Sequence, residues 1–480
     1  MSQTHERKWL ALALLAAAQF VVVLDASIVN VALPSIGKAL DFSQDNLSWV
    51  VNAYTLTFGG FLLLGGRMAD LLGRRLLFIS GLILFAGASL AGGLAQSDVW
   101  LIAARAVQGL GAALLSPAAL SLVTEIFEEG AERNKALGVW GAVAGSGGAA
   151  GVLLGGMLTQ WAGWEWVLFV NVPIGLAAAF LAPRLLPESK NEGARHFDIA
   201  GAVTITAGLS LLVYSLVNAN AAGWASTETL SLIAGAVVLI VAFVLIELRT
   251  KAPLVPFPGI FRVRTIRGIN LTGLLLAMAL FSMFFFISLY MQQVLGYDAL
   301  KAGVAYLPLA LGIIVSAGLA SSLITKFGVR PVLVLGMLLI AVGLFWFAQI
   351  SPGGSYLGDI LFPAVISALG LGFAFVPMTV GAVAGVEPHE AGLASGLINT
   401  SQQVGGALGL AILAAVANSR TDSVVKTGAS MPVALTEGFQ TALLVGAGFA
   451  IVGALIAFLF VDGAVVAPDE GGGEPVPVMG

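Results

Sequence analysis

The chain has 480 residues, of which 58% are hydrophobic and only 10% are charged, and its formal net charge is −4. A soluble domain carries roughly 25% charged residues, so this composition excludes an ordinary soluble enzyme and favours a polytopic α-helical membrane protein. The chain has no cysteine and three scattered histidines, which argues against disulfides, a thiolate metal site or any bound metal.

Fourteen apolar runs are long enough to span a bilayer and are separated by charged, Pro- or Gly-marked breaks. The first six cover residues 10–33, 46–66, 76–95, 99–121, 136–159 and 166–183. Two more cover 198–218 and 229–248, and the last six cover 268–291, 302–323, 331–350, 358–380, 396–418 and 440–461. The sequence therefore predicts an all-α polytopic membrane protein with fourteen transmembrane helices.

Lysine and arginine are distributed unevenly between the two sides of these predicted helices. Seventeen of the 22 basic residues fall in loops on the side of the N-terminus, four fall on the opposite side, and Arg105 lies inside a span. Because cytoplasmic loops of membrane proteins carry the excess of positive charge, both termini are predicted to be cytoplasmic.

The chain also repeats itself over a long range. A Gly-Arg pattern recurs 255 residues later, and two glycine patterns recur at offsets of 261 and 258 residues. These collinear offsets predict two six-helix bundles in parallel repeat, an arrangement typical of transporters that handle substrate between two halves. The predicted parts are a first bundle, two inserted helices with a basic linker, a second bundle and a disordered cytoplasmic tail, over residues 1–190, 191–265, 266–462 and 463–480.

Two charged residues lie inside predicted spans. At 1.5 Å per residue, Asp25 lies roughly 12 Å inward from Leu33, and Arg105 lies roughly 8 Å inward from the outer end of its helix, so the two are at comparable depth. A charge inside the membrane is costly enough to indicate a functional site. Asp25 and Arg105 are predicted to take part in proton coupling; a static structural pair is the alternative, as is an Arg105 that extends to the outer surface. The second half has Ile366 at the position of Arg105, so the predicted chemistry is one-sided.

The connection between the second and third predicted helices contains Gly66, Asp70, Gly73, Arg74 and Arg75. Gly73 permits a tight turn, Asp70 can face a helix N-terminus or a neighbouring arginine, and the two arginines can anchor the cytoplasmic face. This segment is a candidate for function, and an ordinary positively charged loop is the alternative.

Two further groups of residues are candidates for function. Glycines in the fifth predicted span allow close helix packing and bending, and they are Gly147, Gly151, Gly155 and Gly156. Uncharged polar side chains could line a polar cavity or its cytoplasmic mouth, or bridge helices, and they are Asn30, Gln108, Asn399, Gln402 and Gln403.

Four of these stretches resemble signatures of the major facilitator superfamily. The stretch 66–75 resembles its cytoplasmic loop signature, which implies that this segment acts in gating. The stretch 101–111 resembles its signature associated with proton transfer. The stretches 24–34 and 141–156 resemble signatures of the fourteen-span drug:proton antiporters. Two positions depart from these patterns. Leu71 replaces a basic residue, which weakens one expected ion pair. Val152 replaces a proline, so a weaker helix kink is expected.

The resemblance implies a monomer in the bacterial plasma membrane that exports small amphipathic, often cationic, compounds in exchange for protons by rocking of its two halves. No phosphate-binding loop ending in Gly-Lys-Ser/Thr occurs, so a proton gradient, rather than ATP or a cofactor, is the expected energy source. No nucleic-acid partner is expected. A dedicated exporter of one endogenous metabolite or peptide is the nearer alternative, and a non-transporting sensor is the further one.

Overall fold

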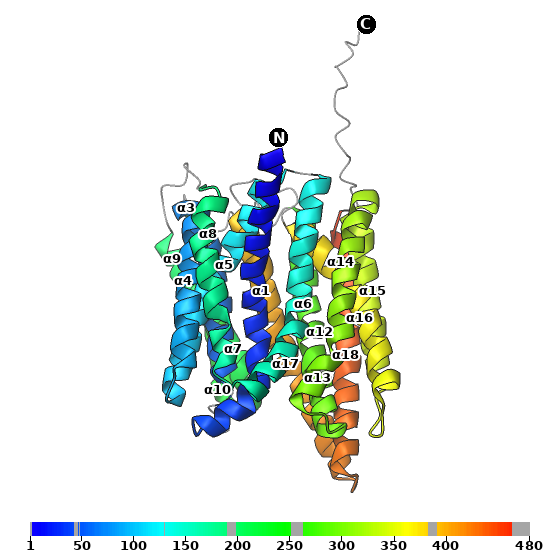
Figure 1. The fold of residues 1–480 in the computed structure, drawn as a ribbon. Helices are drawn as coiled ribbons and strands as arrows, with labels where there is room; N and C mark the ends of the chain where they lie inside the picture. Colours follow the sequence, from blue (N-terminus) through cyan, green and yellow to red (C-terminus); the bar gives the residue numbers. More distant parts are fainter. Residues whose placement is uncertain are drawn as a thin grey trace.

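The computed structural model describes residues 2–42, 47, 49–128, 130–189, 198–250, 263–382 and 391–462. All regular elements in these ranges are helices, and most of them run along one common axis (Figure 1). The first helix, α1 (Ser2–Ala39), begins at the face where the last helix, α18 (Met431–Phe460), ends. We call this the N-terminal face and the other end of the bundle the opposite face.

The helices fall into three groups along the chain. After α1, the first group continues with α3 (Trp49–Leu72), α4 (Arg74–Gly93), α5 (Asp98–Ile126), α6 (Ala131–Trp161), α7 (Trp166–Phe169) and α8 (Asn171–Leu185). The second group is the pair α9 (Ile199–Ala222) and α10 (Thr227–Glu247). The third group precedes α18 and consists of α12 (Arg264–Leu289), the π-helical turn η1 (Tyr290–Val294), α13 (Ala299–Ala305), α14 (Leu307–Phe327), α15 (Val329–Phe347), the π-helical turn η2 (Tyr356–Leu361), α16 (Phe362–Ala382) and α17 (Ala391–Val425).

The predicted all-α fold with up to fourteen spans is confirmed. Thirteen helical segments among the described residues are long and apolar enough to cross a membrane, and the bent α6 brings the total to as many as fourteen. The bend of 43° falls between Gly148 and Ala150, although Val152 stands where the antiporter signature has proline. Neighbouring glycines are a known cause of such kinks, and α6 has Gly147, Gly148 and Gly151 around its bend.

The first and third groups form two halves that repeat the same local contacts. In the first half α5 packs between α3 and α4, and in the second half α16 packs between α14 and α15. A hydroxyl-to-carbonyl bond recurs at these packings. Thr57 Oγ1 donates to Ala106 O over 2.8 Å, and Ser316 Oγ donates to Ala368 O over 2.9 Å. Such recurrence is what a parallel repeat requires.

The two halves contact each other most closely through α6 and through the pair of α3 and α17. Near the N-terminal face, Ser321 Oγ on α14 donates to Asn134 O on α6 over 3.0 Å, and Asn134 Nδ2 lies 3.4 Å from Thr325 Oγ1. Further toward the opposite face, Gly303 of α13 lies against the backbone of Leu153 on α6. The helix α6 therefore connects the first half to the second over most of its length.

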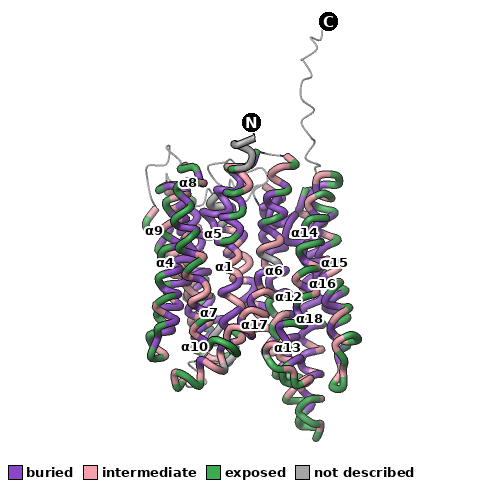
Figure 2. The backbone as a smooth tube through the Cα atoms, in the orientation of Figure 1, coloured by how far each residue is buried: buried purple, intermediate pink, exposed green. Residues whose placement is uncertain are grey.

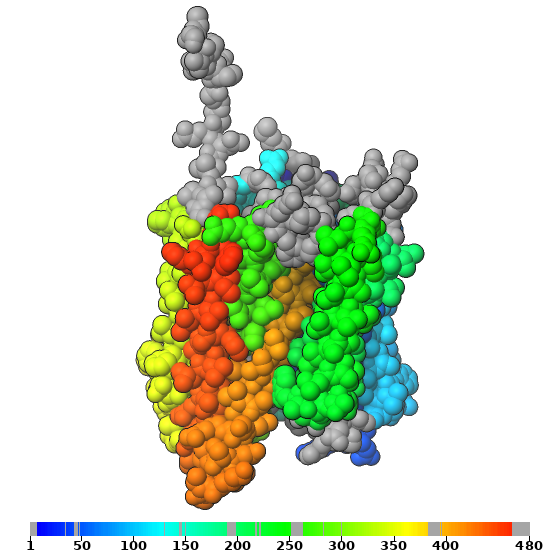
Figure 3. Space-filling model, turned by 180° about the vertical axis from the view of Figure 1, so that it is seen from behind, coloured from blue at the N-terminus to red at the C-terminus, as the bar shows by residue number. Residues whose placement is uncertain are grey.

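The pair α9 and α10 lies on the outside of this two-part bundle (Figure 3). Only α9 packs extensively against the halves, where it contacts α3 and α17, and α10 packs mainly against α9. After Ser231, the exposed side chains on α10 are apolar, as lipid contact requires, and include Val237, Val238, Val241 and Leu245. Figure 2 shows the same pattern for the whole bundle, with buried residues inside and exposed residues on the outer surfaces.

The predicted boundaries between parts, at residues 190, 265 and 462, stay predictions. The predicted disordered tail, 463–480, lies outside the described residues.

One close helix crossing supplies a stability prediction. At Gly336 on α15, an added Cβ would overlap the backbone of Phe373 on α16, whereas nothing lies within 4 Å of a Cβ added at Gly318 on α14. Overpacking typically costs about 1–3 kcal/mol, and alanine in an open helix position gains up to about 1 kcal/mol over glycine. We therefore expect Gly336→Ala to lower the melting temperature in detergent and Gly318→Ala to leave it unchanged or slightly raised. Equal melting temperatures for the two variants would contradict this packing.

Candidate functional site

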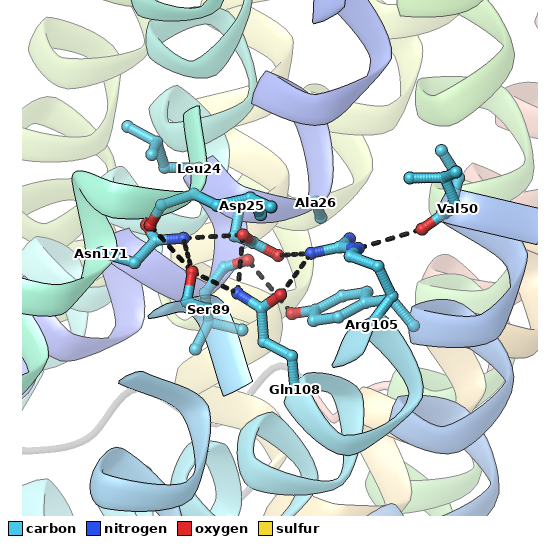
Figure 4. A network of polar contacts seen from close by, with 12 residues as sticks. Leu24, Asp25, Ala26, Val50, Ser89, Arg105, Gln108 and Asn171 are labelled. Atoms are coloured by element: carbon cyan, nitrogen blue, oxygen red, sulfur yellow. Dashed lines mark hydrogen bonds and ion pairs between the residues drawn. The ribbon is translucent and has the colours of Figure 1, made fainter. Parts of the chain in front are cut away.

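Five polar side chains meet inside the first half (Figure 4). They come from four helices and each is at most 1% exposed: Asp25 on α1, Ser89 on α4, Arg105 and Gln108 on α5, and Asn171 on α8. We call this cluster the Asp25 network. A charged pair buried among apolar helices persists only where hydrogen bonds compensate for the lost water.

The centre of the network is an ion pair between Asp25 and Arg105. Arg105 Nη1 lies 2.5 Å from Asp25 Oδ2, and Arg105 Nε donates to Val50 O over 2.9 Å. The guanidinium also stacks over the ring of Tyr54, with Cζ 4.4 Å from the ring centre, and Tyr54 donates to Val22 O over 3.3 Å. Arg105 is thus held by α1 and α3 and does not extend to the outer surface.

Two amides complete the shell around the carboxylate. Gln108 Nε2 and Asn171 Nδ2 both donate to Asp25 Oδ1, over 2.8 and 2.7 Å. Gln108 Oε1 accepts from Arg105 Nη1 over 2.7 Å, which fixes the orientation of this amide. Asp25 therefore accepts three hydrogen bonds, a set that suits the charged form because an ionised carboxylate is an acceptor only.

Ser89 ties the network to a further helix. Its Oγ accepts from Gln108 Nε2 over 3.1 Å and from Asn171 Nδ2 over 3.0 Å, and it donates to Leu168 O on α7 over 2.8 Å. The contacts of this one hydroxyl thus join α4, α5, α7 and α8.

The glycines of α6 bring that helix against the part of α1 that carries Asp25. An added Cβ at Gly147, Gly151 or Gly155 would overlap or crowd α1 between residues 23 and 31, and Gly156 is buried as well. On the α6 side, no side chain stands between the two helices at Gly147, Gly151 and Gly155, so they approach each other closely at the level of the ion pair.

The segment predicted for gating is folded into the N-terminal face. Gly73 separates α3 from α4 with a φ of 120°, a conformation that favours glycine. Asp70 is completely buried, and Arg74 is 6% exposed. Arg74 lies 3.3 Å from the buried Asp70 and 2.9 Å from Glu125, an exposed acid at the end of α5, so this buried arginine ties the turn between α3 and α4 to the end of α5.

The remaining members of this segment lie at its edges. Arg75 lies 3.3 Å from Glu188 and donates to Leu186 O over 3.1 Å, so it holds the chain that follows α8. Gly66 is buried on α3. The ion pairs of Asp70, Arg74 and Arg75 that the structure resolves all lie within the first half.

Most of the uncharged residues predicted to line a cavity lie elsewhere. Asn30 is exposed and donates to Ala26 O of its own helix over 3.0 Å. On α17, Asn399, Gln402 and Gln403 are partly buried, and Gln402 Nε2 lies 3.8 Å from Met378 Sδ. Gln108 alone of the five joins the Asp25 network.

Sequence reasoning missed two members of the network, Ser89 and Asn171. Both lie inside predicted spans, where an uncharged polar residue is a weaker signal than a charge because it can bond to its own helix. Asn171 lies five residues inside the span predicted to begin at 166, and that depth was the available signal.

Residues 15–410 match the family described as the Major Facilitator Superfamily. The match covers most of the chain, so the chain belongs to this family of membrane transporters. It is a multi-pass membrane protein of a transporter family and not of an enzyme family, and the resemblance of its motifs is confirmed.

Similar proteins come from bacteria and are named for resistance or export. The puromycin resistance protein pur8 of Streptomyces alboniger is 40% identical over 478 residues, 98% of this chain and 94% of that protein. The cephamycin export protein CmcT of Amycolatopsis lactamdurans is 43% identical, over 86% of this chain and 85% of that protein. The multidrug transporter protein MdtP of Bacillus subtilis is 31% identical, over 85% and 75%.

Solved structures support the fold. The crystal structure of the human organic anion transporter MFSD10 (TETRAN) matches with a TM-score of 0.68 and 15% identity, over 94% of this chain and 99% of that chain. The proton:xylose symporter XylE matches with a TM-score of 0.66 and 14% identity, over 96% and 97%. At these identities the likeness concerns the fold alone.

The ion pair predicts a coupling between two substitutions. Removing one partner leaves the other charge buried and uncompensated, which typically costs about 3–5 kcal/mol, whereas removing both charges costs less. We therefore expect Asp25→Asn with Arg105→Gln to unfold in detergent at a higher temperature than Arg105→Gln alone. Additive losses of stability in this double-mutant cycle would show that the two groups do not interact.

Proposed function

We propose that this chain is a proton-coupled exporter of small amphipathic, drug-like compounds that works by alternating access of its two halves. The observation that carries the proposal is the buried ion pair of Asp25 with Arg105. An ionisable pair inside a transporter half is a common means of moving protons, and the relatives' names point to export of antibiotics and other drugs.

The coupling we propose acts through the charge of Asp25. While Asp25 is ionised, it draws Arg105, Gln108 and Asn171 together and fixes α1 against α5 and α8. A proton on Asp25 removes the charge that Arg105 balances, which weakens these contacts and lets α1 take a different position. The packing of α6 on α1 through glycines allows such a shift without the displacement of large side chains.

A gate at the N-terminal face fits the same scheme. The contacts of Asn134 with Ser321 and Thr325 join the halves there, and the ion pairs of Arg74 with the buried Asp70 and the exposed Glu125 stiffen the first half. In alternating access, contacts between the halves at one face must break when the protein opens toward that face. We propose that the contacts of Asn134 are among those that break.

We further propose that the protein lies in a bacterial plasma membrane, with the N-terminal face in the cytoplasm, and acts as a monomer. The support is the bias in the sequence, with 17 basic residues in predicted loops on the side of the N-terminus against four on the other side, together with the bacterial relatives. A transport assay with a panel of unrelated drugs that includes puromycin distinguishes the two kinds of exporter. A multidrug exporter transports many of them, and a dedicated exporter transports one compound.

The substitution Asp25→Asn tests the proposed coupling. It mimics a permanently protonated carboxyl, so the purified protein in liposomes should fold but lose transport driven by a pH gradient. Asp422→Asn is the matched control, because Asp422 is an exposed acid at the far end of α17. Proton-driven transport at the wild-type rate in Asp25→Asn, with Asp422→Asn also normal, would reject Asp25 as the coupling residue.

Single cysteines test the proposed orientation, because the chain has none of its own. Glu128 is exposed at the N-terminal face between α5 and α6, and Gly353 is exposed at the opposite face between α15 and η2. An impermeant maleimide added to intact cells should label Gly353→Cys and spare Glu128→Cys until the cells are opened. The reverse pattern would place the N-terminal face outside.

A further inference from the structure

Asn171 has an unused hydrogen-bonding atom beside Asp25. Its Nδ2 group donates to Asp25 Oδ1 over 2.7 Å and to Ser89 Oγ over 3.0 Å. Its Oδ1 is buried and has no hydrogen-bond partner among the residues that the structure describes, and the whole side chain is 0% exposed. A buried polar atom without a partner is costly and calls for an explanation.

The network has few acceptors for a proton on Asp25. A protonated carboxyl must donate its O–H, yet Gln108 Oε1 already accepts from Arg105, and Ser89 Oγ already accepts two hydrogen bonds. Rotation of the Asn171 amide by about half a turn would exchange its nitrogen and oxygen, which have nearly the same shape. The oxygen would then face the carboxyl and accept its proton.

We propose that Asn171 is a positioning residue for proton coupling, whose amide donates to Asp25 when the carboxyl is charged and accepts from it when the carboxyl is protonated. This inference rests on the proposed function of Asp25. The rotation withdraws Nδ2 from Ser89 Oγ, so protonation of Asp25 also loosens the bond that ties α8 to α4. Protonation of Asp25 thereby changes the hydrogen bonding at the junction of α7 and α8, because Asn171 is the first residue of α8.

The groups around Asp25 make the effect of a substitution at Asn171 simple to interpret. Arg105 on α5 is the charged group that contacts it, and Tyr54 on α3 is a titratable group beneath the guanidinium. From α4 and α8 it faces the uncharged Ser89 and Asn171, and α6 presents glycines. A change at Asn171 therefore alters the hydrogen bonding of the carboxyl without adding or removing a charge.

The test replaces Asn171 with leucine, which has a similar size and no polar atoms, and with alanine in parallel in case leucine prevents folding. A hydrogen bond to a charged group is stronger than one to a neutral group, so loss of the amide disfavours charged Asp25 more than protonated Asp25. The pH of half-maximal transport in liposomes should rise by about 0.5–1 unit. Asn270→Leu is the control, since Asn270 is a buried amide of the second half that bonds to Ile266 and Ser401, and it should leave this pH unchanged.

Infrared difference spectra between acid and neutral pH supply a second readout that does not require transport. A protonated Asp25 gives a carboxyl C=O band, identified by its absence in Asp25→Asn. This band should move to higher frequency in Asn171→Leu and in Asn171→Ala, because the carboxyl O–H loses its acceptor. An unchanged band or an unchanged pH of half-maximal transport in these variants would overturn the inference. A carboxyl band that persists in Asp25→Asn would instead count against the proposed function itself.

Discussion

A carboxylate and a guanidinium can share an apolar helix bundle only when nearly all of their polar atoms find partners there. In this protein three donors surround the carboxylate of Asp25, and Arg105 is held by Asp25, Gln108 and Val50 O. These partners come from α1, α3, α5 and α8, so the charge of one side chain determines how four helices fit together. The coupling we propose makes the packing of the first half depend on whether Asp25 carries a proton.

The helix α6 connects this packing to the rest of the molecule. Toward its middle, Gly147 and Gly151 lie against α1 next to Asp25, and near its start Asn134 bonds to Ser321 of the second half. Because α6 touches both the ion pair's helix and the other half, a shift of α1 can be transmitted between the halves without any charged residue in the second half. The bend between Gly148 and Ala150 lies within the segment that contacts α1 and gives the helix a place to flex.

The sequence was most informative about features whose alternatives cost much free energy in a membrane. Each of the fourteen apolar runs overlaps a span of the structure, because a lipid-facing helix has to be apolar over its whole length. Asp25 and Arg105 could be paired from depth alone, since a charge inside a span needs a partner. The bend of α6 was expected to be weak without a proline, yet neighbouring glycines allow it.

Uncharged polar residues were harder to place from sequence. Asn30 and Asn171 look alike in the sequence, but Asn30 bonds to its own helix while Asn171 bonds across to α1 and α4. Which of the two occurs depends on the rotation of each helix about its axis, and a single sequence determines this only loosely. Arg74 shows the same limit, because a basic residue in a loop predicts surface exposure, whereas the buried Asp70 and nearby Glu125 draw it inward.

Proton release on substrate binding tests the central claim most directly, because it needs neither a membrane nor a pH gradient. Purified protein in weakly buffered detergent, at a pH where Asp25 holds its proton, is mixed with a transported compound, and the released protons are counted with an indicator dye. If substrate and proton compete through Asp25, the wild-type protein should release up to about one proton per molecule and Asp25→Asn should release none. Equal release from both proteins, or no release from the wild type at any pH where it binds substrate, would contradict the account.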